Sequence, residues 1–94
     1  MAITVSERPE RHRYEISVDG ALAGFTLVTL DDDVAIMPHT EIDPEYKGQG
    51  LATTLIRTAL DDARARGLRV VPRCPFVRAF IEGYPDYQAL LART

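Results

Sequence analysis

Cysteine, tryptophan and long apolar runs are scarce in this sequence. Cys74 is its one cysteine, so an internal disulfide cannot form and cysteines alone cannot build a metal centre. A free thiol is typical of a reducing compartment, and we expect a cytoplasmic protein without a metal site. No apolar run reaches the roughly 18 residues of a membrane span, and Met1–Val5 lacks the basic start of a secretory signal.

The length suits one small domain. The chain has 94 residues, of which 46% are hydrophobic and 27% are charged, a composition typical of globular proteins. We therefore expect residues 1–94 to form a single domain. A chain this short buries a modest core, so a bound ligand or a homodimer would add to its stability.

The two halves of the chain differ in charge. Residues 1–45 contain three arginines and ten acidic residues, whereas residues 46–94 contain eight cationic and four acidic residues. The net charge is −3, so the chain lacks the basic surplus of a nucleic-acid-binding protein. The basic half fits a compact polyanionic ligand, although arginines that solvate helix faces would give the same count.

Apolar and polar residues alternate in the first half, as in half-buried strands. Asp19-Gly20 predicts a tight hairpin turn, and Asp31–Asp33 predicts the next turn. Pro38 cannot donate to a sheet, which indicates a bulge or a sheet that splits open. We expect antiparallel strands over residues 3–5, 14–18, 21–30 and 34–42.

The second half has helical spacing around one short strand. An amphipathic helix is expected to begin at Leu51 and end before Gly67, which suits a C-terminal cap. A short strand then ends at Pro72, and Pro75 opens a second helix. A last short helix begins at Tyr84. We expect the core face of the second helix to consist of Phe76, Val77, Phe80 and Ile81.

Residues 42–52, IDPEYKGQGLA, have the composition of a phosphate-binding turn. A strand end, two glycines and a helix start leave several backbone amides unpaired at the positive end of the helix. No G-x-x-x-x-G-K-[ST] motif is present, and Thr53 stands where a dinucleotide fingerprint has its third glycine. By itself, such a loop is as often only a tight turn.

Position by position, this segment resembles the acyl-CoA-binding motif R/Q-x-x-G-x-G/A of the GNAT superfamily of N-acetyltransferases. Lys47, Gly50 and Ala52 fall on its three motif positions. Within the superfamily the chain is similar to short single-domain proteins, through His39-Thr40 and through residues 71–76, VPRCPF. The resemblance extends from about residue 12 to residue 91.

The resemblance implies a truncated GNAT fold of the mixed α/β (α+β) class. A four-stranded antiparallel meander would precede the CoA-loop helix, a parallel fifth strand and C-terminal helices. It also implies that acetyl-CoA, or CoA, places its pyrophosphate on the amides from Gly48 to Ala52, while its pantetheine arm pairs with Glu41 to Asp43. The residues implied to bind the cofactor are Glu41, Ile42, Asp43, Lys47, Gly48, Gln49, Gly50, Leu51, Ala52 and Cys74.

The sequence departs from the family pattern in three places. Lys47 stands where Arg or Gln is usual, so a cation remains but a bidentate fork is lost. Residues 3–5 run almost directly into residues 14–18, so the helices that usually help to form the acceptor pocket are missing. The usual tyrosine acid would fall near Phe80 or Ile81, and neither donates a proton.

Three residues are candidates for catalysis, namely His39, Glu41 and Cys74. Imidazole titrates near neutrality, which suits a base that deprotonates an amine. Glu41 shares a strand face with His39 and could orient the imidazole or act through water. A hydrogen-bonded strand histidine and a surface carboxylate are the plainer alternatives.

Cys74 lies between Arg73 and a helix start, and both would lower the pKa of its thiol. Its roles include proton donor to the CoA thiolate, transient acyl acceptor and partner in a mixed disulfide, while a buried small hydrophobe is the alternative. Tyr84 is either a substitute proton donor or a residue that packs the last helix, and packing is the reading we favour.

The sequence therefore predicts an acetyl-CoA-dependent N-acetyltransferase that transfers an acetyl group to an amine by direct attack. An amine acceptor is the expected partner, with neither nucleic acid nor membrane. The alternative is a CoA-binding module with little or no transferase activity. Nothing in the sequence identifies the acceptor.

Overall fold

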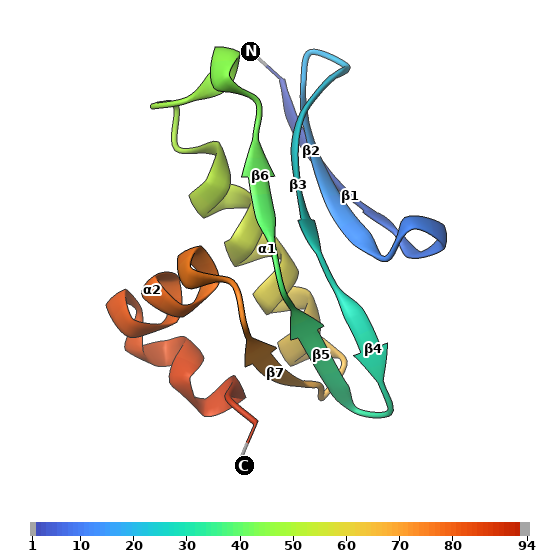
Figure 1. Ribbon diagram of the computed structural model, residues 1–94, viewed down its shortest axis with the longest axis vertical. Helices are drawn as coiled ribbons and strands as arrows, with labels where there is room; N and C mark the ends of the chain where they lie inside the picture. The colour runs from blue at the N-terminus through green and yellow to red at the C-terminus, as the bar shows by residue number, and fades with distance from the viewer. Residues whose placement is uncertain (1, 93–94) are drawn as a thin grey trace.

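Two sheets share the seven strands found in residues 2–92, the part of the chain that the computed structural model describes (Figure 1). Neighbouring strands are antiparallel except β5 and β7, which are parallel. The first sheet has the order β1 (Ile3–Arg8), β2 (Arg13–Val18), β3 (Ala21–Leu27) and β6 (Thr40–Ile42). The second has the order β4 (Thr29–Asp31), β5 (Val34–Met37) and β7 (Arg69–Pro72).

The hairpin between β2 and β3 confirms the turn expected at Asp19-Gly20. Asp19 has φ 50° and Gly20 has φ 86°, the left-handed values that a two-residue turn of type I′ requires. The next turn likewise contains a left-handed residue, Asp32, with φ 53°. Both turns connect strands that pair antiparallel, as expected.

Between residues 21 and 42 the chain changes sheet twice, and both changes interrupt an expected strand. Residues 34–42 are divided at Pro38 into β5 and β6, which confirms that the sheet splits there. The single return strand expected over residues 21–30 is wrong, because Val28 separates β3 from β4. The amide of Val28 still donates to the carbonyl of His12, at 2.8 Å, in the register of the β2–β3 ladder, and from Thr29 onward the chain pairs with β5 instead.

The first helix, α1 (Leu51–Ala65), has the expected boundaries. It begins after Gly50 and is followed by Gly67, whose φ of 71° closes it. It packs against β2, β3 and β6, and in Figure 1 it passes behind β6. Its buried face consists of Leu51, Leu55, Ile56, Ala59, Leu60 and Ala63.

The second helix, α2 (Pro75–Gly83), begins at the expected proline. Val77, Phe80 and Ile81 are buried as expected, but Phe76 is not a core residue, since 43% of its surface is exposed. The reason is local: Phe76 lies in the first turn of α2, where the helix faces an open cleft rather than α1.

The expected last helix is a 3₁₀ helix, η3 (Pro85–Leu90). Tyr87 and Leu90 are buried in it. The Tyr84 ring lies 4.5 Å from the Phe80 ring, centroid to centroid, and the Arg57 guanidinium lies 5.1 Å from the Tyr84 centroid. These contacts are those of the packing role favoured for Tyr84.

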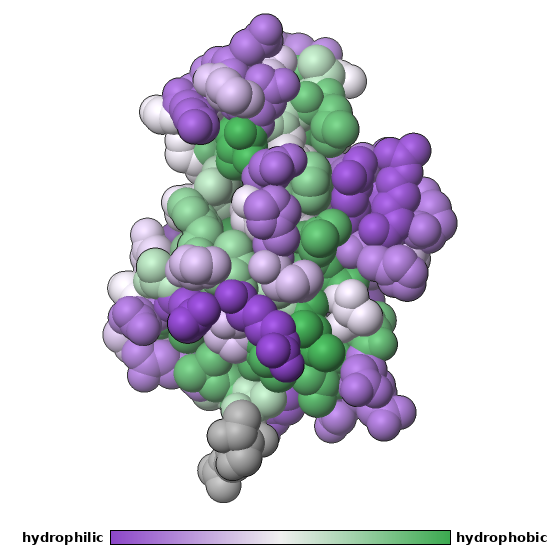
Figure 2. All heavy atoms as spheres, in the orientation of Figure 1, coloured by the Kyte–Doolittle hydropathy of each residue, from purple (hydrophilic) through white to green (hydrophobic). Residues whose placement is uncertain are grey.

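The face of the first sheet opposite α1, which we call the open face, carries Glu15, Phe25 and Glu41 on neighbouring strands. A short 3₁₀ turn, η1 (Pro9–Arg11), connects β1 to β2 and contains no buried residue. Figure 2 shows the hydrophilic side chains that gather over this turn. Within residues 2–92 no helix is long and apolar enough to cross a membrane.

Glu15 is a buried acid on this open face. Only 8% of the residue is exposed, and its carboxylate pairs with Arg13 at 2.6 Å, Arg11 at 3.2 Å and Arg8 at 3.4 Å. Burial alone would raise the pKa of Glu15, but the three guanidinium groups outweigh burial and hold this pKa below its usual value. All three arginines of residues 1–45 thus form ion pairs with this one carboxylate.

Candidate active site

A cleft of about 370 Å³ lies between β6, the first turn of α1 and the start of α2. We call it the inner cleft. Its position is where the two sheets separate, because β6 stays with β3 while β7 leads into α2. The residues that line it are Thr40, Ile42, Tyr46, Lys47, Gly48, Gly50, Leu51, Ala52, Thr53 and Phe76.

The glycine loop closes one end of the inner cleft. Asp43 caps a 3₁₀ turn, η2 (Pro44–Tyr46), by accepting the amide of Glu45 at 3.0 Å. Gly48 with φ 81° and Gly50 with φ 73° then turn the chain into α1, and a Cβ at either glycine would meet no atom within 4 Å. Left-handed glycines therefore bring bare backbone to the cleft at the positive end of α1, as phosphate binding requires.

Strand β6 forms the side of the inner cleft and is the last strand of its sheet. It pairs with β3 along one edge, so within residues 2–92 its other edge has no strand partner. An extended ligand can pair with such an edge through its amide groups. The pantetheine arm of CoA carries amides of this kind.

Residues 39 to 42 alternate between the two sides of β6. His39 and Glu41 point to the open face, and His39 Nε2 lies 3.4 Å from Glu41 Oε1. About half of the His39 side chain and 64% of the Glu41 side chain are exposed. The pair meets as the strand alternation predicts, beside Phe25, whose ring centroid is 6.3 Å from that of His39.

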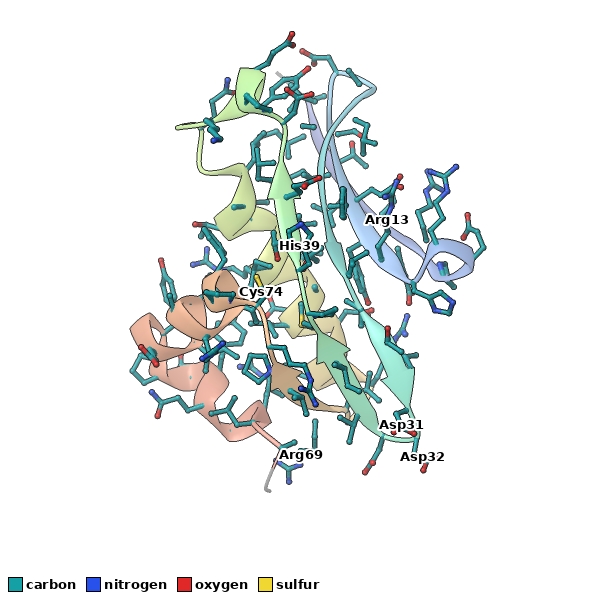
Figure 3. All side chains as sticks on the ribbon, viewed as in Figure 1. Arg13, Asp31, Asp32, His39, Arg69 and Cys74 are labelled. Carbon is teal, nitrogen blue, oxygen red and sulfur yellow. The ribbon has the colours of Figure 1, made fainter. Side chains whose placement is uncertain are left out.

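Thr40 points the other way, towards Cys74. The Thr40 hydroxyl lies 2.8 Å from the hydroxyl of Thr26, which is fully buried, and the Cys74 thiol donates to Thr40 Oγ1 at 3.5 Å. Cys74 is the residue that precedes α2 and is 4% exposed. Figure 3 shows its sulfur at the start of α2, facing the strand that carries His39.

The surroundings of Cys74 lower the pKa of its thiol. Burial alone would raise this pKa, but the Thr40 hydroxyl and the backbone amides of Val77 and Phe76 stabilise the thiolate and outweigh burial. The helix start thus contributes as the sequence suggested, while Thr40 rather than Arg73 supplies the second contribution. Cys74 is thus buried, and the pKa of its thiol is lowered.

The structure distributes the expected cofactor residues over two cavities. Six of them, Ile42, Lys47, Gly48, Gly50, Leu51 and Ala52, line the inner cleft. Glu41 and Asp43 line a separate cavity with Lys47 and Ile42, which border both. Gln49 and Cys74 line neither cavity, although the Cys74 thiol contacts Thr40, which lines the inner cleft.

Sequence reasoning did not assign four of the residues that line the inner cleft, namely Thr40, Tyr46, Thr53 and Phe76. Alternation along β6 could have identified Thr40, because a strand that turns His39 and Glu41 outward must turn Thr40 inward. Phe76 gave no such signal, since an apolar residue at helical spacing normally belongs to the core.

Comparison with known proteins relates this chain to N-acetyltransferases and to solved structures of the same fold. A Bacillus subtilis relative, named for N-acetylation of alanine in ribosomal protein bS18, is 39% identical over 69 residues, which cover 68% of this chain and 46% of the relative. The chain thus spans less than half of that relative. The solution structure of a GCN5-like protein from Staphylococcus aureus has a TM-score of 0.73 at 18% identity, covering 97% of this chain and 89% of that protein.

Another solved structure contains the expected cofactor. N-acetylglutamate synthase from Neisseria gonorrhoeae, solved with coenzyme A and N-acetylglutamate, has a TM-score of 0.56 at 18% identity, covering 72% of this chain and 18% of that protein. The sequence model of the GCN5-related N-acetyl-transferase family matches residues 13–90, which include both sheets' paired strands from β2 onward, the glycine loop and α2. The chain therefore belongs to the GCN5-related N-acetyltransferase family.

Proposed function

We propose that this protein binds acetyl-CoA in the inner cleft and transfers the acetyl group to an amine by direct attack. The observation that carries the proposal is the pair of left-handed glycines, Gly48 and Gly50, which open the first turn of α1 onto the inner cleft in a chain of this family. The pyrophosphate of CoA binds the amides from Gly48 to Ala52, with the Lys47 ammonium beside it.

In this proposal the two reactants approach β6 from different sides. Acetyl-CoA lies along the cleft side, with its sulfur towards Thr40 and Cys74, and the amine arrives from the open face beside His39 and Glu41. The amine nitrogen forms a bond to the thioester carbon, the carbon–sulfur bond breaks, and CoA leaves as a thiolate. His39 accepts the proton released by the amine, and Glu41 orients the imidazole.

One observation favours the alternative, a CoA-binding module with little or no transferase activity. By the family resemblance the usual tyrosine acid would fall near Phe80 or Ile81, which are 6% and 2% exposed and form part of the core. Neither can protonate the CoA thiolate. In the transferase proposal the Cys74 thiol gives that proton, and its contact with Thr40 of the inner cleft supports this assignment.

Ligand-dependent stability tests the cofactor site. Acetyl-CoA at about 100 times its Kd should stabilise the folded protein by about 2.7 kcal/mol, and Gly50→Trp should abolish the resulting rise in Tm. Gly67→Trp is the matched control, because Gly67 is also left-handed and open but ends α1. No rise in the parent protein would contradict both the transferase and the binding module.

An assay of acetyl transfer distinguishes the transferase from the CoA-binding module. Release of CoA is followed with a thiol reagent in the presence of simple alkylamines and of a peptide with an N-terminal alanine, the residue named for the Bacillus subtilis relative. Transfer to any amine above background supports the transferase. A clear Tm shift without transfer to any of them favours the binding module.

A further inference from the structure

A second cavity, of about 460 Å³, lies on the open face beside β6. We call it the outer pocket. Its size falls in the range of small-molecule sites. Because Glu41 points to this face while Thr40 points to the inner cleft, the two cavities border β6 from different sides. Its lining consists of Leu22, Ala23, Gly24, Phe25, Glu41, Ile42, Asp43, Pro44 and Lys47.

The charges of the outer pocket are unevenly placed along it. At the end near His39, Glu41 carries a carboxylate that is 64% exposed and has no cation of residues 2–92 against it other than a protonated His39. At the other end Asp43 and Lys47 bring one charge of each sign, and Asp43 already caps η2. The pocket therefore attracts one cation, at its Glu41 end.

The middle of the outer pocket is apolar. Leu22 and Phe25 of β3 form one wall, and Pro44 forms part of the other. Leu22 is a large apolar residue on the surface, with 48% exposure. Apolar walls favour an aliphatic stem, and they disfavour a second ammonium, which would lose water without gaining a partner.

We propose that the outer pocket is the acceptor site and selects primary amines whose ammonium ends an unbranched aliphatic stem. The ammonium pairs with Glu41 beside His39, and the stem extends along Leu22 and Phe25 towards Pro44. This inference rests on the proposed acetyl transfer for its chemistry, but the pocket can be tested for binding without it. A free alkylamine and a lysine side chain share the selected chemistry.

A chain-length series tests the stem. Each methylene that leaves water contributes about 0.8 kcal/mol, so kcat/KM should rise about two- to fourfold per methylene from ethylamine to hexylamine in this half-open pocket. Spermidine should be a poorer acceptor than hexylamine. Equal rates along the series, or a preference for spermidine or for an alanyl peptide, would overturn the proposal.

Two surface leucines provide a matched pair of variants. Leu22→Asn removes the apolar wall and should flatten the chain-length dependence, whereas Leu30→Asn, at a leucine that is 51% exposed on β4, should keep it. The Tm shift with acetyl-CoA shows that both variants retain the cofactor site. The same slope in the two variants would overturn the assignment of the stem to Leu22.

Binding measured without turnover separates this inference from the proposed function. Hexylamine titrated into the CoA-bound protein should shift the amide signals of Leu22, Phe25 and Glu41 in NMR spectra. If these signals shift but no amine is acetylated, amine binding in the outer pocket is supported and the proposed acetyl transfer is contradicted. If they do not shift, the pocket proposal is overturned, even where other amines are acetylated.

Transfer to Nα-acetyl-lysine methylamide at the rate of pentylamine would identify a lysine side chain as the source.

Discussion

His39 and Cys74 are separated by a single short strand, and each faces a different solvent environment. His39 is half exposed beside Glu41, whereas Cys74 is buried against Thr40. In the proposed transfer the amine loses a proton and the CoA thiolate gains one, so two proton-transfer groups on opposite sides of β6 fit this chemistry. The alternating geometry of β6 provides this separation without further elements.

Replacement of His39 should affect transfer and leave cofactor binding unchanged. General base catalysis contributes typically 10²–10⁴-fold, so His39→Gln should lower kcat/KM for the amine by about that factor. The Tm shift with acetyl-CoA should stay at the parent value, since His39 lies on the open face. Equal activity of the two proteins would show that Glu41 or another group accepts the proton.

The Thr40 hydroxyl should control the ionisation of Cys74. With one cysteine in the chain, thiolate absorbance near 240 nm reports this thiol alone. Thr40→Val should move the Cys74 titration to higher pH, because the hydroxyl that stabilises the thiolate against burial is then lost. Thr40→Ser keeps a hydroxyl and should keep the titration near the parent position. If Val and Ser titrate alike, the backbone amides of α2 alone are responsible for the lowered pKa.

Glu15 should make folding sensitive to acid. Its pKa is lowered in the folded protein, so its stabilising contribution is present above the pKa of an unfolded glutamate, about 4.3, and is lost as the pH falls through the folded value. Glu15→Gln should lower Tm at pH 7 and flatten the decline below about pH 5. Thermal unfolding at several pH values measures both, and parallel declines would show that other carboxylates dominate.

At the scale of elements, close packing of β6 against β3 fixes the position of β6, the strand that lies between the two cavities. Gly24 faces Ile42 across this pair, and a Cβ on Gly24 would come within 2.5 Å of the Glu41 carbonyl oxygen and of Ile42 Cδ1. A backbone atom cannot move aside as a flexible side chain can. Any larger residue must therefore push β6 away from β3.

Gly24→Ala should thus destabilise the fold by about 1–3 kcal/mol, the usual cost of overpacking. Gly83→Ala is the control: this glycine lies at the end of α2, and a Cβ there would meet no atom within 4 Å. It should be neutral or slightly stabilising. Denaturant unfolding compares the two, and a neutral Gly24→Ala would mean that β6 moves more freely than its pairing indicates.

The elements were largely predictable because local chemistry determines them. Helix α1 follows from apolar spacing and Gly67, and the first hairpin follows from Asp19-Gly20. The division at Pro38 was also visible, since proline removes a sheet donor. The division at Val28 was not, because it depends on Thr29 pairing with Ile36 of β5 rather than with β2, which no local pattern encodes.

The candidate site was predictable to the same degree. The glycine loop is a local motif, and alternation placed His39 beside Glu41. The outer pocket could not be found from the sequence, because Leu22 of β3 and Pro44 after β6 meet only when the sheet forms. The contact of Cys74 with Thr40 likewise joins residues that are 34 positions apart.

At the scale of the whole molecule, α1 ties the acidic half of the chain to the basic half. Tyr14 of β2 donates to Asp62, and Arg66 pairs with both Glu7 of β1 and Asp62. Tyr87 of η3 donates to Asp61 at 2.7 Å. Two neighbouring acids of α1 thus hold the first sheet on one side and the C-terminal segment on the other.

These tyrosines should make the fold sensitive to alkali. Burial, and to a smaller extent the hydrogen bond to Asp62, raises the pKa of Tyr14. Burial and the hydrogen bond to Asp61 likewise raise the pKa of Tyr87. Their contribution is therefore complete below the unfolded tyrosine pKa, about 10, and is lost as the pH rises through the folded value. Tyr14→Phe should cost about 1 kcal/mol at pH 7 and flatten the loss of stability above about pH 10. Unchanged alkaline slopes would contradict this.

The η1 turn has a consequence for protein engineering. Residues Pro9–Arg11 contain no buried side chain and join two adjacent strands at the border of the open face. New segments inserted there would lengthen a surface loop, which costs little in closure entropy, and would remove no core contact. A grafted helical hairpin could fold back over the outer pocket as a roof, so that acceptor preference could be rewritten by a single cassette while the cofactor half is left untouched.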